Sequence, residues 1–288
     1  MSPVIPLIPI AEVFGPTIQG EGDLAGHSTY FLRVGGCDFS CRWCDSAHAV
    51  LAEQVRELPR WTPKEIIDNL TAYRRLHPGP QWLTISGGNP VLYDLQSVVV
   101  AWKLVDHGKV AVETQGSRWK GWLADVDLLT ISPKPPSSGM ANSSDFKVFM
   151  SEVDHALSAN GGQASGLCAV LKVVVFDDRD YEFAQRVHRM YPDTPFYLSC
   201  GTASGGLDGR WAPPALPEGY FANYDKFKQI RERQPMNWTS SAYTDTELTL
   251  LERYRWLAER VMADPEMADV AALPQLHALL WGPTTKGV

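Results

Sequence analysis

Six apolar runs rich in β-branched and aromatic residues recur along this chain, and stretches with helical spacing separate them. The runs predict strands at residues 29–34, 81–85, 109–112, 126–131, 167–176 and 196–198. Strands that alternate with helices form a parallel sheet with right-handed crossovers. The sequence therefore predicts an α/β fold of about six parallel strands, arranged as an incomplete barrel or an open sheet.

The clearest predicted helix begins at Thr62-Pro63-Lys64-Glu65, where a capping box is combined with proline at the first helical position. Further helices are expected at 92–107, closed by a left-handed Gly108, and at 146–159, 181–190 and 246–262. Residues 201–219 are rich in Gly, Pro and Ala and predict a long loop. Because no linker stands out, we expect residues 1–288 to form a single domain with a C-terminal helical extension.

The formal net charge of −7 argues against a broad grip on nucleic acid or anionic lipid, which needs a surplus of Lys and Arg. The first fifteen residues lack the basic lead of a signal peptide and are interrupted by prolines. No apolar run approaches the roughly 20 residues that span a bilayer. We therefore expect a soluble, cytoplasmic protein without a nucleic-acid or membrane partner.

Small and polar groups follow five of the predicted strands. In parallel α/β folds the loops after the carboxyl ends of the strands converge on one opening, where ligands bind. The groups are Gly35-Gly36-Cys37, Ser86-Gly87-Gly88-Asn89-Pro90, Glu113-Thr114-Gln115-Gly116, Ser132-Pro133-Lys134 and Ser199-Cys200-Gly201. Turns also favour Gly, Pro and Ser, so the prediction of a shared site depends on all five groups together.

Three of the five cysteines, Cys37, Cys41 and Cys44, lie within eight residues. The odd total and the clustering favour a metal site over a disulfide framework. Thiolates suit zinc or an iron–sulfur cluster, and three of them leave one iron of a four-iron cluster open to a further ligand. The alternatives are buried free cysteines or a structural zinc completed by Cys200, with His48 a weak further candidate.

The Cys-x-x-x-Cys-x-x-Cys spacing, with Trp43 before the last cysteine, resembles the signature of radical S-adenosylmethionine enzymes. More narrowly, the chain is similar to the 7-carboxy-7-deazaguanine synthase family in motifs that follow one order along nearly its whole length. These are Gln19-Gly20-Glu21-Gly22, Phe31 to Cys37, Trp43-Cys44-Asp45-Ser46, Ser86 to Pro90, Glu113 to Gly116, Ser132-Pro133-Lys134, Leu171 to Val174 and Pro274 to His277. The resemblance implies an incomplete (β/α) barrel of the radical SAM type.

The resemblance also implies a reaction and its cofactors. A [4Fe-4S] cluster, S-adenosylmethionine and Mg²⁺ are expected, and a reduced cluster cleaves S-adenosylmethionine to a 5′-deoxyadenosyl radical. That radical removes hydrogen from 6-carboxy-5,6,7,8-tetrahydropterin, whose ring contracts with loss of ammonia to give 7-carboxy-7-deazaguanine for 7-deazapurine (queuosine-type) biosynthesis. A flavodoxin or ferredoxin reductant and a homodimer are implied in the same way.

Site residues follow from the resemblance, motif by motif. It implies that Cys37, Cys41 and Cys44 hold the cluster and that Ser46 is a ligand of Mg²⁺. The implied substrate residues are Ile18, Gln19, Gly20, Glu21, Arg33 and Ser86, with Glu21 and Arg33 catalytic. The implied cofactor residues are Trp43, Cys44, Asp45, Gly87, Gly88, Glu113, Ser132, Pro133, Lys134, Ser199 and Cys200.

Several of these roles have a physical reason. A carboxylate at Glu21 matches the two adjacent donors of the guanidine-like edge of a pterin, and Arg33 matches the substrate carboxylate. Gly87 and Gly88 allow the backbone to approach the cofactor closely. The plainer interpretation is that Glu21 and Arg33 are surface charges or pair with each other.

Two residues outside this set have an open interpretation. Lys172, within an apolar run, is either a barrel-interior contact or a lysine that protects an edge strand. His277 is either part of the site or a core histidine.

The chain departs from the family pattern at three places. Asn89 stands where the family usually has glutamate, Ser46 replaces a common threonine, and Ser199-Cys200 replaces a Gln-Pro pair near the adenosine. Two other functions remain open at this point. One is an activase that generates a glycyl radical on a partner protein, and the other is a non-catalytic iron–sulfur module.

Overall fold

The computed structural model describes residues 7–105, 107–141, 144–158, 166–202, 206–207, 210–214, 245–282 and 287. They form one sheet of nine strands in the order β3-β1-β2-β4-β5-β6-β7-β8-β9. The strands are β1 (Ile8–Ile18), β2 (Ser28–Val34), β3 (Arg60–Trp61), β4 (Trp82–Gly87), β5 (Lys109–Thr114), β6 (Leu128–Ile131), β7 (Cys168–Val175), β8 (Phe196–Cys200) and β9 (Ala271–Leu273).

All neighbouring pairs from β2 through β9 are parallel, whereas β1 pairs antiparallel with both β2 and β3. The six predicted strands are therefore confirmed, and the α/β fold with a mostly parallel sheet is confirmed with them. Strand β1 was not predicted because Pro9 and Pro16 interrupt its pattern. The structure accommodates Pro16 where the register with β2 shifts between Phe14 and Thr17, a place at which a strand tolerates proline.

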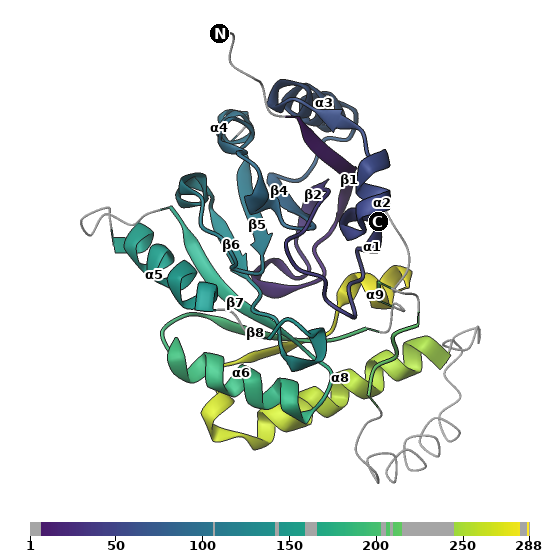
Figure 1. Cartoon of the computed structure of the whole chain (residues 1–288), viewed down its shortest axis with the longest axis vertical. Coiled ribbons are helices and arrows are strands. Elements are labelled where there is room, and N and C mark those ends of the chain that lie inside the picture. Colours follow the sequence, from purple (N-terminus) through teal and green to yellow (C-terminus); the bar gives the residue numbers. More distant parts are fainter. Residues whose placement is uncertain are drawn as a thin grey trace.

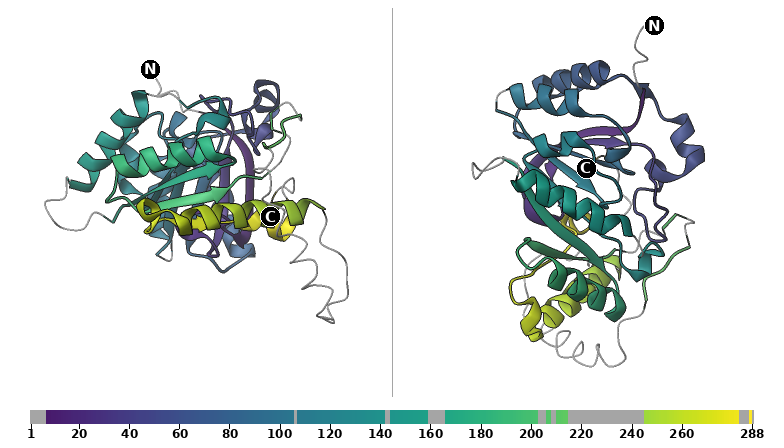
Figure 2. Two further views of the ribbon diagram at one scale, coloured as in Figure 1. Left: turned by 90° about the horizontal axis from the view of Figure 1, so that it is seen from below. Right: turned by 60° about the vertical axis from the view of Figure 1, so that its left-hand side comes forward.

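The helices follow the strands along the chain and surround the sheet. They are α1 (Ala47–Val50), α2 (Ala52–Glu57), α3 (Pro63–Leu76), α4 (Gln96–Leu104), α5 (Ser144–Ser158), α6 (Asp178–Met190), α8 (Asp245–Ala263) and α9 (Leu276–Trp281). Helices α3, α4, α5, α6 and α8 form an outer arc around the strands, and α1, α2 and α9 lie on the other side (Figure 1). Figure 2 shows α6 and α8 side by side, where the Tyr181 hydroxyl on α6 donates to the Arg260 carbonyl on α8.

Helix α3 has the predicted capping box between Thr62 and Glu65. Helix α4 differs from its prediction, because residues 90–92 form a 3-10 turn and the helix begins only at Gln96. The left-handed residue after it is His107, with φ of 54°, and not Gly108. The predicted loop at 201–219 lies mostly outside the described residues.

The two faces of the sheet have different partners. Alternate strand residues such as Leu171, Val173 and Val175 pack outward against the helices and form the main core. On the inner face a second, smaller cluster of Leu24, Ala111, Leu128 and Val170 fills the space near the amino ends of the strands. The inner face at the carboxyl ends is therefore left for polar side chains.

Among the helices that the structure describes, none is long and apolar enough to cross a membrane.

Candidate active site

A cavity of about 240 Å³ opens at the carboxyl ends of the parallel strands. Its walls come from β1, β2, the cysteine loop, β4 to β7 and α9. The residues predicted for the site that line it are Ile18, Gln19, Gly20, Glu21, Arg33, Cys37, Cys41, Trp43, Cys44, Asp45, Ser46, Ser86, Gly87, Gly88, Glu113, Ser132 and Lys134. The structure thus brings together almost all of the predicted set.

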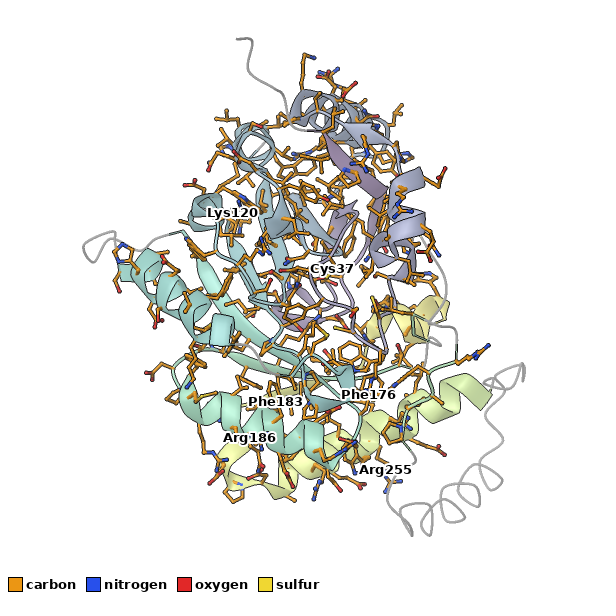
Figure 3. All side chains as sticks on the ribbon, viewed as in Figure 1. Cys37, Lys120, Phe176, Phe183, Arg186 and Arg255 are labelled. Atoms are coloured by element: carbon orange, nitrogen blue, oxygen red, sulfur yellow. The ribbon has the colours of Figure 1, made fainter. Side chains whose placement is uncertain are left out.

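The three clustered cysteines face this cavity from the loop between β2 and α1, and Figure 3 shows Cys37 near the middle of the molecule, inside the arc of helices. Burial raises the pKa of all three thiols, that of Cys44 to about 12. Buried thiols in this state ionise when a metal binds them, with release of protons. Their chemistry fits a thiolate-bound iron–sulfur cluster.

A zinc site completed by the other candidates is not formed. Cys200 packs in the main core, and His48 Nε2 lies 3.3 Å from the Glu12 carboxylate. Within the described part of the chain, no group of three or more His, Cys, Asp or Glu side chains is placed to hold one metal ion.

Gly87 and Gly88 are required by the protein's own backbone. A Cβ on Gly87, whose φ is +136°, would lie 2.1 Å from the Val34 carbonyl oxygen, and a Cβ on Gly88 would lie 2.0 Å from that of Gly36. Backbone hydrogen bonds from Gly88 to Val34 (3.0 Å) and from Asn89 to Gly36 (2.7 Å) hold the two loops together. These contacts bring the end of β4 against the start of the cysteine loop.

A buried ion pair forms another part of the cavity wall. Lys172 Nζ donates to Glu21 Oε2 and lies 4.0 Å from Glu113 Oε1. Burial alone would raise the pKa of Glu21, but Lys172, His277 and hydrogen bonds from Lys172 and Gln275 lower it to about 2. Burial would likewise lower the pKa of Lys172, but the Glu21 and Glu113 carboxylates raise it above its ordinary value. Both groups are therefore charged at neutral pH.

Two residues from the C-terminal part of the chain complete this wall. The Leu276 amide donates to the Gly20 carbonyl at 3.1 Å, which docks the start of α9 beside β1. Gln275 Nε2 then donates to Glu21 Oε1, while Gln275 Oε1 is buried without a partner. His277 packs so closely on Gly20 that a Cβ there would lie 2.3 Å from its Nδ1.

A second charged group surrounds Arg33. Its Nε donates to Glu12 Oε2 at 2.8 Å, and one terminal nitrogen donates to Ser46 Oγ at 2.9 Å. Ser46 Oγ in turn donates to Asp45 Oδ1 at 3.0 Å. Despite burial, hydrogen bonds and charge from His48 and Arg33 lower the pKa of Glu12. Glu21 and Arg33 are thus neither surface charges nor partners of each other, which excludes the plainer interpretation.

Two hydroxyl groups and a cation line the remaining wall. Lys134 Nζ donates to Ser132 Oγ at 3.0 Å and lies 5.6 Å from the centre of the Trp43 ring. Ser86 Oγ is buried, faces the cavity and has no partner in the protein. An unsatisfied buried hydroxyl at a cavity indicates a ligand that completes it. This wall therefore has the donors and acceptors that a polar cofactor requires.

Three predicted residues do not reach the cavity: Pro133, Ser199 and Cys200. Cys200 belongs to the outward-facing set of β8 and packs in the main core, because strand residues alternate between faces. Asn89 is also fully buried outside the cavity, where its Oδ1 accepts from the Thr114 hydroxyl at 2.9 Å. The predicted contact of Cys200 with the cofactor is contradicted by this placement.

The site has members that the sequence did not assign to it. Glu12 gave no signal in the sequence. Gln115, Gln275, Lys172 and His277 were noted only as members of motifs or were left open. Strand β7 lies between β6 and β8, so Lys172 does not protect an edge strand. The signal that identifies it is a lysine in the middle of an apolar run, since a buried cation needs a buried partner.

Comparison with known proteins agrees with this geometry. Residues 18–130 match the family model described as a 4Fe-4S single cluster domain. The 7-carboxy-7-deazaguanine synthase of Bacillus cereus is 37% identical over 96% of this chain and 97% of that protein. The enzyme of the same name from Bacillus subtilis is 35% identical, over 96% of each chain. The chain belongs to the 7-carboxy-7-deazaguanine synthase family.

Membership of this family makes the chain an enzyme, and it removes the alternatives of an activase or a non-catalytic module. The crystal structure of QueE from Escherichia coli has the same fold, with a TM-score of 0.51 at 22% identity over 69% of this chain and 86% of that one. The cavity of this chain opens at the carboxyl ends of the parallel strands, the edge of the sheet at which the sequence predicted a site.

Proposed function

We propose that this chain converts 6-carboxy-5,6,7,8-tetrahydropterin to 7-carboxy-7-deazaguanine with loss of ammonia, by radical chemistry, in 7-deazapurine (queuosine-type) biosynthesis. One observation carries the proposal: a single cavity has three thiols on one wall and a buried carboxylate held by a lysine on the other. The first wall suits an iron–sulfur cluster, and the second suits a ligand rich in N–H donors. Family membership supports the same reaction.

Cys37, Cys41 and Cys44 would hold a [4Fe-4S] cluster that S-adenosylmethionine completes. When bound, the cluster and S-adenosylmethionine supply the radical that removes a hydrogen atom from the substrate. The protein's part is to bind, orient and exclude water. Trp43, Asp45, Gly87, Gly88, Glu113, Ser132 and Lys134 line the cavity and are the proposed S-adenosylmethionine contacts. The unpartnered Ser86 hydroxyl, predicted to bind substrate, supports a polar ligand in the same cavity.

Glu21 would bind the guanidine-like edge of the pterin. A carboxylate has about four acceptor positions, of which Lys172 and Gln275 occupy two, so acceptor positions remain for the substrate. The unpartnered Gln275 Oε1 beside Glu21 adds another acceptor. Lys172 keeps Glu21 ionised and is itself a fixed hydrogen-bond donor. This wall would therefore bind the substrate with both of its groups remaining charged.

Arg33 would bind the substrate carboxylate on the adjacent wall. Its guanidinium has five N–H donors, and the contacts with Glu12 and Ser46 fix its plane. Mg²⁺ would take Ser46 Oγ as its protein ligand, with other oxygens from substrate and water. Ser46 Oγ has two acceptor positions, so one would accept from Arg33 while the other is available to the ion, and the remaining N–H donors of Arg33 are available to the substrate carboxylate.

The proposals for the barrel architecture, the cellular location, the oligomeric state and the reductant rest on the same resemblance. We propose that the chain is one domain, an incomplete (β/α) barrel with a C-terminal helical extension. The single sheet supports one domain, and helices α8 and α9, which follow β8 in the chain, support the extension. We also propose a cytoplasmic homodimer that takes electrons from a flavodoxin or ferredoxin.

An anaerobic turnover assay tests the proposal. The iron-reconstituted protein is given dithionite, S-adenosylmethionine, Mg²⁺ and 6-carboxytetrahydropterin, and products are identified by mass spectrometry. We expect 7-carboxy-7-deazaguanine without matching consumption of S-adenosylmethionine. Formation of 5′-deoxyadenosine with the pterin unchanged would leave the radical chemistry but overturn the substrate assignment.

A further inference from the structure

The sulfur of Cys37 has two hydrogen-bond donors in the protein. The Phe39 amide lies 3.4 Å from Cys37 Sγ, and Gln115 Nε2, from the loop after β5, lies 3.7 Å from it. Gln115 is buried, with 6% of its surface exposed. The donation from Phe39 follows from the local turn, but the donation from Gln115 comes from a residue 78 positions away and needs a separate reason.

Asp38 sets the orientation of the Gln115 amide. Gln115 Nε2 lies 2.6 Å from Asp38 Oδ1, and a carboxylate only accepts hydrogen bonds, so the nitrogen and not the oxygen of the amide faces it. The same NH₂ group has a second hydrogen, which is shared between Cys37 Sγ at 3.7 Å and Ser117 Oγ at 3.4 Å. The carboxylate therefore fixes Gln115 as a donor, and never an acceptor, at the sulfur.

Asp38 is held in turn by Asn89, by Ser117 and by an ion pair with Arg118, whose Nε lies 3.3 Å from Asp38 Oδ2. Asn89 Nδ2 lies 2.8 Å from Asp38 Oδ1, and the Ser117 hydroxyl donates to Asp38 Oδ2 at 2.7 Å. Asn89 is itself fixed by the Thr114 hydroxyl, which donates to its Oδ1. A glutamate at position 89 would have no N–H to donate and would place a second carboxylate beside Asp38. The asparagine is thus matched to Asp38, which explains this departure from the family pattern.

We propose that Gln115 is a hydrogen-bond donor to the Cys37 thiolate of the cluster and makes the cluster easier to reduce, with Asp38 and Asn89 as its positioning residues. N–H donors to a ligating sulfur stabilise the extra negative charge of a reduced cluster and so raise its potential. The couple gains one electron from the external one-electron reductant, and no bond forms or breaks at Gln115. The inference rests on the proposed function, because it requires the cluster.

Replacement of Gln115 by methionine tests this. Methionine keeps the length and neutrality of the side chain and removes the N–H. The matched control is Ser40→Ala, which removes a hydrogen bond from the same loop to the Met140 sulfur and leaves the bonds of Gln115 and Asp38 in place. The reconstituted proteins are poised at fixed potentials with dithionite and mediators, and the reduced cluster is counted by electron paramagnetic resonance.

We expect a reduced-to-oxidised ratio about tenfold lower in Gln115→Met than in the wild type at the same potential, equivalent to about 59 mV for one electron. The iron content should be unchanged, and Ser40→Ala should match the wild type. Equal ratios in Gln115→Met and the wild type would overturn the inference while leaving the proposed function intact. A wild-type chain that binds no cluster would instead overturn the proposed function.

A second measurement needs no variant and covers a Gln115→Met protein that does not fold. Wild-type protein labelled with ¹⁵N only in glutamine side-chain amides is reduced and studied by pulsed electron paramagnetic resonance. We expect a ¹⁵N coupling to the cluster, which the unlabelled Phe39 amide cannot supply. Absence of this coupling would overturn the inference.

Discussion

The two walls of the cavity are built in different ways. The cysteine wall is the loop that carries Cys37, Cys41 and Cys44. Hydrogen bonds to the Asp38 carboxylate hold this loop to the loops after β4 and β5. The carboxylate wall is an ion pair between Glu21 and Lys172, closed by Gln275, and these residues are 151 and 254 positions from Glu21. The first wall presents neutral thiols that a metal must ionise, whereas the second presents charges that already exist.

This difference assigns cofactor assembly to the cysteine wall and substrate recognition to the carboxylate wall. A wall whose thiols lose protons on metal loading changes its charge as the cofactor is assembled. A wall whose carboxylate has a pKa of about 2 keeps its charge under all ordinary conditions and provides a constant recognition surface. The comparison therefore predicts that damage to one wall leaves the other functional.

The largest effect is expected at the cysteine wall. Cys41→Ala removes a cluster ligand, and we expect complete loss of the bound cluster, measured as iron and sulfide content after reconstitution. The apoprotein should still unfold cooperatively, since the carboxylate wall is untouched. Retention of a full iron complement would refute the ligand assignment.

At the carboxylate wall, Lys172→Met leaves Glu21 buried without its countercharge. Removal of one partner of a buried pair costs about 3–5 kcal/mol, and we expect a loss of that size in the free energy of unfolding measured by urea titration. The double variant Lys172→Met/Glu21→Gln, in which no buried charge is left unpaired, should recover part of the loss. A single variant as stable as the wild type would contradict the buried pair.

The contact between the end of β4 and the start of the cysteine loop is tested by Gly87→Ala. Its φ of +136° and its approach to Val34 predict a loss of about 1–3 kcal/mol in the unfolding free energy of the iron-free protein. Gly79→Ala, where a Cβ meets nothing within 4 Å, is the matched control. If Gly87→Ala changed only the affinity for S-adenosylmethionine, the glycine would serve the cofactor and not the backbone.

The charge of the carboxylate wall predicts a dependence of stability on pH. Because the pKa of Glu21 falls from 4.5 to about 2 on folding, its contribution is complete above pH 4.5 and is lost as the pH falls toward 2. As the pH is lowered through this window, the unfolding free energy of the wild type should decrease. The decrease should be roughly 1–3 kcal/mol smaller in Glu21→Gln, which lacks the carboxylate. Parallel curves for the two proteins would show that Glu21 is not held ionised.

The smallest effect is expected from Cys200→Ser. The side chain packs in the main core and not at the cavity, so the affinity for S-adenosylmethionine should not change. A buried hydroxyl in place of a thiol should cost about 1–2 kcal/mol of stability. A tenfold weaker affinity with unchanged stability would place Cys200 near the cofactor after all.

The cysteine wall was largely predictable from the sequence, and the carboxylate wall was not. Cys37, Cys41 and Cys44 are close in sequence, so their spacing alone predicted a shared site. Strand alternation and loop position likewise predicted where Ser86 and Glu113 lie. Gln275 and Lys172 reach Glu21 only through the assembly of β7 into the sheet and the docking of α9, so that no local pattern identifies Glu21 as their partner.

Other differences have local causes. The proline-interrupted β1 was missed because its irregular register with β2 hides the alternation of a strand. Helix α4 begins late because residues 90–92 close a 3-10 turn against the cysteine loop. Cys200 was placed at the site from its position after a strand, but the face on which it lies depends on the register of β8.

The most direct test of the division between the two walls is the affinity of Glu21→Gln for 6-carboxytetrahydropterin, measured anaerobically on iron-reconstituted protein with S-adenosylmethionine present. We predict the full iron content of the wild type and a substrate affinity roughly 10–100-fold weaker, because a charged acceptor at the pterin edge is lost. An unchanged substrate affinity would contradict the assignment of the carboxylate wall to the substrate.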